Sequence, residues 1–118
     1  MRLCLFIAIA TFAAPVAAEL DYVTDRTLCG LAPIDRSERG MTFTGKNFYE
    51  IEYFCELADP MPPLDGSDTT HMSIGYCEAP GDVFPTVFVL RSFRSEPNVL
   101  YVYESDNSDG TVFFNCQP

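Results

Sequence analysis

The apolar positions of this chain follow two different patterns. Residues 3–14 form a nearly continuous hydrophobic run, whereas from residue 41 onward apolar and polar positions alternate in short segments. A period of two is typical of β-strands that bury one face, and no segment shows the period of a long amphipathic helix. The pattern therefore predicts an all-β domain that follows a short hydrophobic leader.

Six short strands are predicted after residue 40. The clearest covers residues 48–57, and its continuous apolar face is expected to lie inside the domain. The opposite face mixes carboxylates with phenylalanines, so we expect it to be half exposed or covered by another segment. The inward face holds Tyr49, Ile51, Tyr53, Cys55 and Leu57, and the outward face holds Phe48, Glu50, Glu52, Phe54 and Glu56. The other strands are expected at residues 41–44, 72–77, 83–90, 99–104 and 111–116.

Turn-forming sequences separate these strands and favour a small antiparallel meander, closed into a barrel or folded into a sandwich. Residues 19–40 are predicted to be irregular or to contain one short helix that begins at Asp21 or Thr24 and ends near Gly30, with a charged loop at residues 35–39. The proline-rich segment 59–70 is predicted to be a long loop, and such loops are often functional or mobile. Pro85 marks a strand start, a bulge or an edge, and the apolar run after it is expected to be buried on both faces.

The leader has the order of a secretory signal peptide. Arg2 precedes the apolar run, and small residues follow at Val16, Ala17 and Ala18. This arrangement predicts cleavage after Ala18, so residues 1–18 form the signal peptide and residues 19–118 form a single secreted or periplasmic domain. No second apolar run is long enough to span a bilayer, so we expect no membrane association after cleavage.

The cysteines are interpreted through this predicted compartment. Cys4 belongs to the leader, and the domain keeps Cys29, Cys55, Cys77 and Cys116. An even number of cysteines in an oxidising compartment predicts two disulfides, with three possible pairings. A meander would place Cys77 at the other end from Cys55 and Cys116, which favours long-range bridges over a bond between Cys55 and Cys77. No close C-x-x-C pair is present, so we expect no metal site, and no cofactor motif is apparent.

The chain is strongly acidic, with 17 Asp and Glu residues against 7 Lys and Arg residues and a net charge of −10. Loss of the leader with Arg2 would lower this charge by one, to −11. Such a surface repels nucleic acid and anionic lipid, so neither is an expected partner. It favours a basic protein as partner, although net charge also serves solubility alone.

The acidic row at Glu50, Glu52 and Glu56 is the first candidate for chemistry. Paired carboxylates two residues apart on a strand are spaced suitably for glycoside hydrolysis, but a solvated strand face or a docking surface has the same pattern. Phe48 and Phe54 share this predicted face. Large apolar side chains beside charges are typical of contact patches and also of small aromatic cores.

His71 is the only histidine, and it follows the long loop. A general base or a metal ligand is one interpretation, and a strand-entry histidine without a catalytic role is the other. No G-x-S-x-G motif accompanies it. A small secreted hydrolase that uses His71 with a loop carboxylate is therefore kept as an alternative function.

The sequence Ser73-Ile74-Gly75-Tyr76 resembles the S-G-x-x-Y loop of small periplasmic lysozyme-inhibitor domains, with the glycine displaced and the spacing changed, and Tyr53-Phe54-Cys55 adds to the resemblance. The resemblance implies a disulfide-bearing antiparallel barrel and carries over no functional residue. We expect a non-enzymatic secreted or periplasmic binding domain, of which an acidic inhibitor of a basic hydrolase is one concrete form. A purely structural envelope protein is the remaining alternative.

Overall fold

A computed structural model describes residues 9–13, 19–105 and 107–117 of the chain, so most of the expected signal peptide lies outside the described residues. Within these residues, eight antiparallel strands form a closed barrel, which confirms the predicted all-β meander. The strands are β1 (Tyr22–Val23), β2 (Thr42–Phe43), β3 (Asn47–Glu50), β4 (Tyr53–Leu57), β5 (Thr69–Ala79), β6 (Asp82–Phe93), β7 (Glu96–Glu104) and β8 (Asn107–Asn115).

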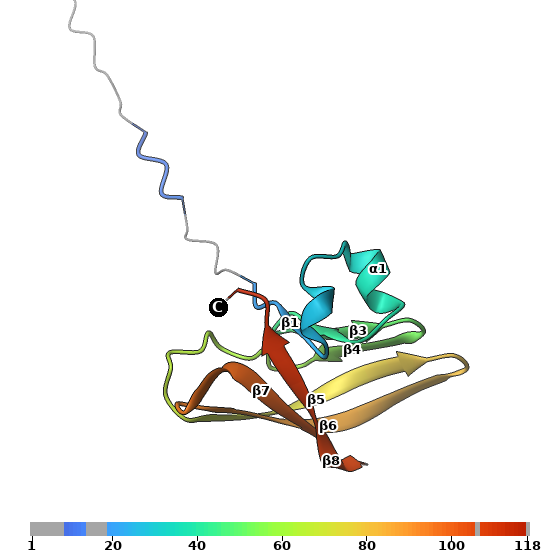
Figure 1. Cartoon of the computed structure of the whole chain (residues 1–118). Helices are drawn as coiled ribbons and strands as arrows, with labels where there is room; N and C mark the ends of the chain where they lie inside the picture. The colour runs from blue at the N-terminus through green and yellow to red at the C-terminus, as the bar shows by residue number, and fades with distance from the viewer. Residues whose placement is uncertain (1–8, 14–18, 106, 118) are drawn as a thin grey trace, which may run out of the picture.

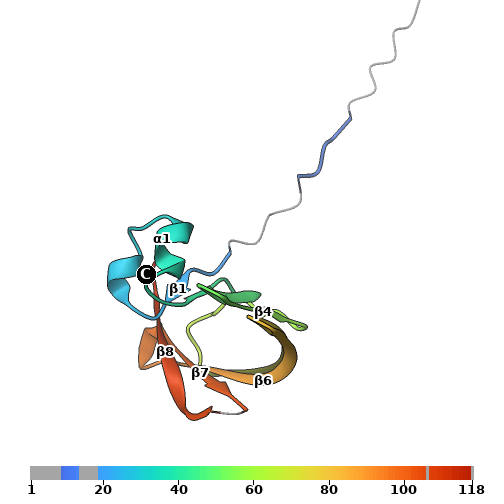
Figure 2. The same cartoon turned by 90° about the vertical axis from the view of Figure 1, so that its right-hand side faces the viewer.

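Each strand pairs with its neighbour in sequence, and the barrel closes where β1 pairs with both β2 and β8. This closure therefore rests on a strand of two residues. Figure 1 shows β5 and β6 as a long hairpin, and the short β3–β4 hairpin lies beside its closed end, where β4 pairs with β5. The view in Figure 2, turned by 90°, shows how β6 curves between β4 and β7.

The predicted strand at residues 48–57 is in fact a tight hairpin. β3 ends at Glu50 and β4 begins at Tyr53, so Ile51 and Glu52 form a two-residue turn between paired strands. The turn shifts the alternation between the two strands. The predicted faces hold in β4, where Cys55 and Leu57 are buried and Phe54 is exposed, but they are reversed in β3, where Phe48 is buried. This split, together with the unpredicted β1, gives eight strands where six were expected.

The segment before β2 contains two short helices (Figure 1). A 3-10 helix, η1 (Arg26–Leu28), is capped by Asp25, whose carboxylate accepts a hydrogen bond from Thr27 N–H at 2.9 Å. The second helix, α1 (Pro33–Ser37), lies where a charged loop was predicted. Pro33 suits the first turn of a helix because its missing N–H would have no partner there. The short predicted helix that ends near Gly30 corresponds to η1, with Asp25 as its cap instead of Asp21 or Thr24.

The barrel core is aromatic. Phe48 stacks on Phe43 with ring centroids 4.2 Å apart and on Phe88 at 4.8 Å, and Phe113 packs edge-on against Phe48 at 5.7 Å. These rings belong to four strands, so one aromatic cluster joins β2, β3, β6 and β8. Phe48 is 1 % exposed, and it is therefore a core residue.

In β5, the small residues point into the barrel and the large apolar residues point outward. Ser73, Gly75 and Cys77 are buried, whereas the larger Met72 and Ile74 are exposed. Gly75 is inward because Phe88 of β6 lies over it: a Cβ atom at this position would stand 2.3 Å from the Phe88 ring. In β6, Val87 is exposed, so the expectation that the run after Pro85 is buried on both faces is wrong.

Both expected disulfides are present, and they connect Cys29 to Cys116 and Cys55 to Cys77. The preference against a bond between Cys55 and Cys77 is wrong, because these residues are direct cross-strand partners with Cα atoms 4.0 Å apart. β5 begins well before its pairing with β4, and this offset brings Cys77 opposite Cys55. The two bridges are consistent with an oxidising extracellular compartment.

Pro85 lies at an open edge, as one of the predicted alternatives stated. β7 pairs only with the second half of β6, beginning at Phe88. The backbone of Val87 exchanges hydrogen bonds with Ser105, so the backbone groups of Val87, and those of Pro85 two residues before it, point away from β5. The missing N–H of Pro85 thus faces an edge with no strand partner, where it discourages pairing with another chain.

Candidate functional site

Exposed apolar side chains gather on the outer surface of β4, β5 and β6. From residue 19 onward, the described residues include nine large exposed hydrophobic ones, and six of them share this surface. Contiguous exposed apolar area of this kind marks interaction sites more often than scattered single residues do. We call this surface the outer patch, and it consists of Phe54, Met72, Ile74, Tyr76, Val83 and Val87.

Strand pairing makes the outer patch continuous. Ile74 lies opposite Val87, and Met72 lies opposite Val89. One row further along, Tyr76 stands between Glu56 and Pro85. Directly opposite residues on one sheet face have Cβ atoms about 5 Å apart, so these side chains form a single surface.

Two carboxylates interrupt the apolar surface. Glu78 lies between Phe54 and Val83 in its cross-strand row, and Glu56 lies beside Tyr76. Lys46 Nζ is 3.0 Å from Glu56 Oε1, with both side chains about half exposed. An exposed ion pair of this kind contributes little to stability, so Glu56 can exchange Lys46 for a cation of a partner. The outer patch thus combines apolar contact area with negative charge.

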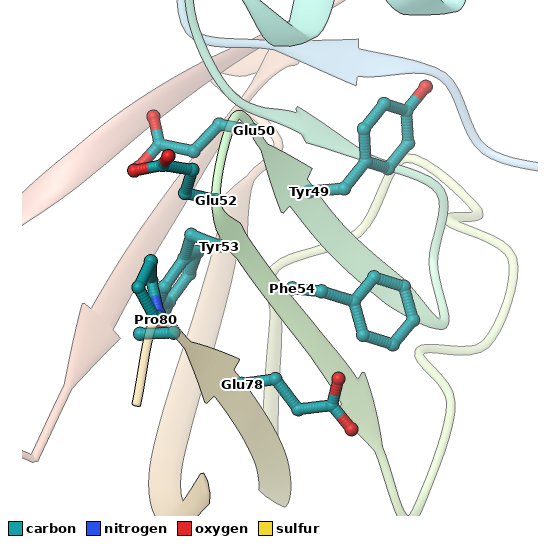
Figure 3. Close-up of a pocket in the computed structure, with 8 residues that line it drawn as sticks. Tyr49, Glu50, Glu52, Tyr53, Phe54, Glu78 and Pro80 are labelled. Atoms are coloured by element: carbon teal, nitrogen blue, oxygen red, sulfur yellow. The ribbon is translucent and has the colours of Figure 1, made fainter. Parts of the chain in front are cut away.

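A hollow of about 420 Å³ lies at the end of the β3–β4 hairpin beside the outer patch. Figure 3 shows that its side chains leave the hairpin on two sides: Tyr49, Phe54 and Glu78 project to one side, and Glu50 and Glu52 project to the other. Three carboxylates and three aromatic rings, the third from Tyr53, therefore line this hollow at one end of the barrel. Aromatic faces and carboxylates both attract cationic side chains.

Glu52 holds an unusual backbone conformation. Its φ of 60° lies in the left-handed region, which is uncommon for residues other than glycine. The neighbouring Ile51 N–H donates a 2.6 Å hydrogen bond to the Ser37 carbonyl at the end of α1, which anchors the turn. α1 therefore helps to fix the position of the acidic turn.

The predicted candidate residues separate into two groups. Glu50, Glu52 and Phe54 meet at the hairpin end, and Glu56 lies on the same outer surface further along β4. Phe48 belongs to the aromatic core, because the turn at residues 51–52 places it on the inner side of the barrel, opposite the buried Cys55. The four acidic and aromatic residues therefore remain candidates for binding, whereas Phe48 does not.

His71 lies apart from this surface, in β5 after the long loop, where it contacts the first residue of that loop. Its Nε2–H donates a 2.8 Å hydrogen bond to the Asp59 carbonyl, and Ser73 Oγ accepts a hydrogen bond from Asp59 N–H at 3.0 Å. The loop carboxylate of Asp59 is 4.0 Å from His71 Nε2. Because Nε2 carries a proton that is committed to a backbone carbonyl, this arrangement favours a structural role, in which β5 side chains hold the first residue of the loop.

We expect replacement of His71 by Ala to loosen the loop. One neutral hydrogen bond contributes about 1 kcal/mol, so the free energy of unfolding should fall by about that amount. Amide hydrogen exchange should become faster at residues 59–61, and Thr70→Ala, an exposed neighbour on the same strand, is the control. Unchanged exchange in the loop would contradict the structural role.

The outer patch is the main feature that the sequence analysis missed. Met72, Ile74 and Tyr76 share one face of the strand predicted at residues 72–77, but the exposure of that face was not predicted. These residues point to the opposite face of the strand from Cys77. Because disulfide cysteines of a small domain are usually buried, this could have indicated that the three side chains are exposed.

Comparison with known protein families, curated proteins and solved structures gives no match for this chain. The segment that resembles the lysozyme-inhibitor loop, residues 73–76, lies in the middle of β5 and not in a loop. In the described ranges, no helix is long and apolar enough to cross a membrane.

Proposed function

We propose that this protein is a non-enzymatic, exported binding domain whose outer patch docks a basic protein. The observation that carries the proposal is the concentration of six exposed hydrophobic residues, with Glu56 and Glu78 among them, on one surface of β4–β6. A surface of this composition fits a partner that offers an apolar centre with Lys or Arg at its rim. The net charge of −10 also favours a basic partner.

The hollow at the hairpin end supplies the second part of the proposed contact. Glu78 projects to the same side as Tyr49 and Phe54, so a Lys or Arg side chain of the partner can contact a ring and a carboxylate together, and Glu50 and Glu52 add negative charge on the other side of the hairpin end (Figure 3). Among the described residues, no hydrogen bond or ion pair uses the carboxylates of Glu52 or Glu78. These charges are therefore open to a partner.

Binding to a basic lysozyme and to a basic nuclease tests the proposal. The oxidised protein should bind at least one of them, and affinity should fall between about 0.02 M and 0.3 M salt because screening becomes stronger. Ile74→Ala should weaken binding about tenfold, as truncation of a central contact residue does. Ile34→Ala is the matched control, because Ile34 is also exposed but belongs to α1.

A charge-reversal pair separates local from global electrostatics. Glu78→Lys and Glu38→Lys change the net charge equally, but only Glu78 lies on the outer patch, whereas Glu38 follows α1. We expect only Glu78→Lys to weaken binding strongly. Equal effects of the two variants, or no salt-sensitive binding to either basic protein, would overturn the proposal.

A further inference from the structure

A second hollow, of about 430 Å³, lies under the long loop on another part of the barrel. Its walls come from the chain before and within β1, from the end of β6, the start of β7 and the end of β8, and from four residues of the loop, Pro63, Leu64, Gly66 and Ser67. We call this hollow the loop pocket. Leu20, Pro63, Leu64, Phe93 and Pro97 supply its apolar lining.

The loop that covers this pocket is fixed at several points. Met61 is 5 % exposed, packs into the barrel core, and donates its N–H to the Gly45 carbonyl at 2.8 Å. At the far end of the loop, the Asp68 carboxylate accepts a hydrogen bond from Arg94 N–H at 2.8 Å, which joins the loop to the β6–β7 turn. The pocket walls are thus held in place before a ligand arrives, which reduces the entropy cost of binding.

The lining carries no charged residue, although 24 charged residues occur in the chain. Tyr22 contributes a phenol, and burial raises the pKa of Tyr22 above its ordinary value, so this group also stays neutral. An ionic ligand would have to leave water without a compensating partner, which is costly. The lining therefore selects for a neutral ligand.

One hydroxyl group in the lining has no partner among the described residues. Ser92 is 5 % exposed and points to the inner side of β6, and no hydrogen bond among the described residues uses its hydroxyl. Its oxygen is not one of the fully buried unpaired atoms, which are Thr42 Oγ1 and Asn47 Oδ1, so it can be reached from the pocket and can form a hydrogen bond with a bound molecule. Asn115, whose Oδ1 accepts a hydrogen bond from Gln117 N–H, keeps its amide donors available in the same lining.

We propose that the loop pocket binds a neutral, mostly apolar small molecule that forms a hydrogen bond with the Ser92 hydroxyl. The volume lies in the range of small-molecule sites, and an apolar lining with a few polar groups is their usual composition. This site is separate from the outer patch, and it does not depend on the proposed protein partner.

Two dyes with the same ring skeleton test the selection for neutral ligands. N-phenyl-1-naphthylamine is neutral, and 1-anilinonaphthalene-8-sulfonate adds one sulfonate group. The fluorescence of the neutral dye should rise on saturable, one-to-one binding, and the sulfonate should bind at least about tenfold more weakly because its charge loses water in the pocket. Equal affinity for both dyes, or no saturable binding of the neutral dye, would overturn the proposal.

Three variants locate the binding site. Ser92→Ala should weaken binding of the neutral dye about threefold to tenfold, the value of one hydrogen bond. Ser67→Phe, at an exposed position of the rim, should block the pocket, whereas Ser108→Phe at the exposed start of β8 should have no effect.

Ile74→Asp distinguishes the pocket from the exposed apolar surface. Dye binding should survive this change, and its loss would assign the dye to the outer patch and contradict the proposal. Thermal unfolding of each variant without dye, together with dye-induced chemical-shift changes at Leu64 and Phe93 in the unaltered protein, keeps the conclusion independent of folding defects in the variants.

Discussion

Removal of the Cys29–Cys116 bridge by replacing both cysteines with Ala is expected to cost more stability than any other change considered for this chain. The bridge closes a loop with a sequence separation of 87 residues. In the chain-entropy relation, a closure of this length contributes about 4.6 kcal/mol, chiefly because it restricts the unfolded chain. Since domains of this size are stable by only about 5–15 kcal/mol, the variant should be close to unfolding at physiological temperature.

Urea denaturation of the oxidised protein measures this effect. The slope of the free energy against urea concentration should increase in the variant, because an unfolded chain without the long cross-link exposes more surface. The Cys55–Cys77 pair is the internal comparison, since its separation of 22 residues predicts a smaller entropic contribution of about 3.4 kcal/mol. A loss below about 1 kcal/mol for Cys29–Cys116, with an unchanged slope, would contradict the expectation.

Arg36→Met is expected to produce the second largest loss, about 3 kcal/mol, because it would leave a partly buried carboxylate and two carbonyl groups without their partner. The Arg36 guanidinium lies 2.6 Å and 3.3 Å from the two carboxylate oxygens of Asp21. It also donates hydrogen bonds to the carbonyls of Cys29 and Leu31, at 2.9 Å and 3.0 Å. The side chain is nearly buried, so one residue of α1 holds the segment before β1 and the segment around Cys29 together.

Chemical denaturation compares this variant with Arg39→Met, which removes an exposed arginine two positions after α1 and should change stability by no more than about 0.5 kcal/mol. A double-mutant cycle with Asp21→Asn isolates the ion pair. The double variant should lose less free energy of unfolding than the sum of the two single variants, because each single substitution already breaks the same contact. Equal losses for Arg36→Met and Arg39→Met would show that the buried arrangement does not contribute as described.

The fold class could be predicted from the sequence because the alternation after residue 40 is strong and turn-forming residues separate most strands. The hairpin at Ile51 and Glu52 could not, since neither residue is a usual turn former and alternation continues through both positions. Its conformation depends on tertiary contacts, above all the hydrogen bond from Ile51 N–H to Ser37 in α1. One missed turn reversed the predicted faces of β3, including that of Phe48, whereas Phe54 in β4 lies on the exposed face as predicted.

The candidate site was predicted only in its charged part. Glu50, Glu52 and Glu56 are visible in the sequence as a row of acids, but exposure of Ile74 and Tyr76 depends on which face of β5 enters the barrel. Gly75 decides this, because only a glycine fits beneath the Phe88 ring. A contact between residues of two strands determines the face, and single-strand alternation does not contain that information.

The closure of the barrel by β1 also has a consequence for the order of folding. β1 lies near the start of the domain, and one of its two partners, β8, is the last strand to leave the ribosome or a translocation channel. Hairpins such as β5–β6 can form while synthesis or transport continues, since their contacts are local. Closure, and the oxidation of Cys29 with Cys116, must wait for the final strand. Until then, the aromatic interior stays open along one side, and this is the interval in which the chain is most exposed to aggregation and to incorrect thiol pairing.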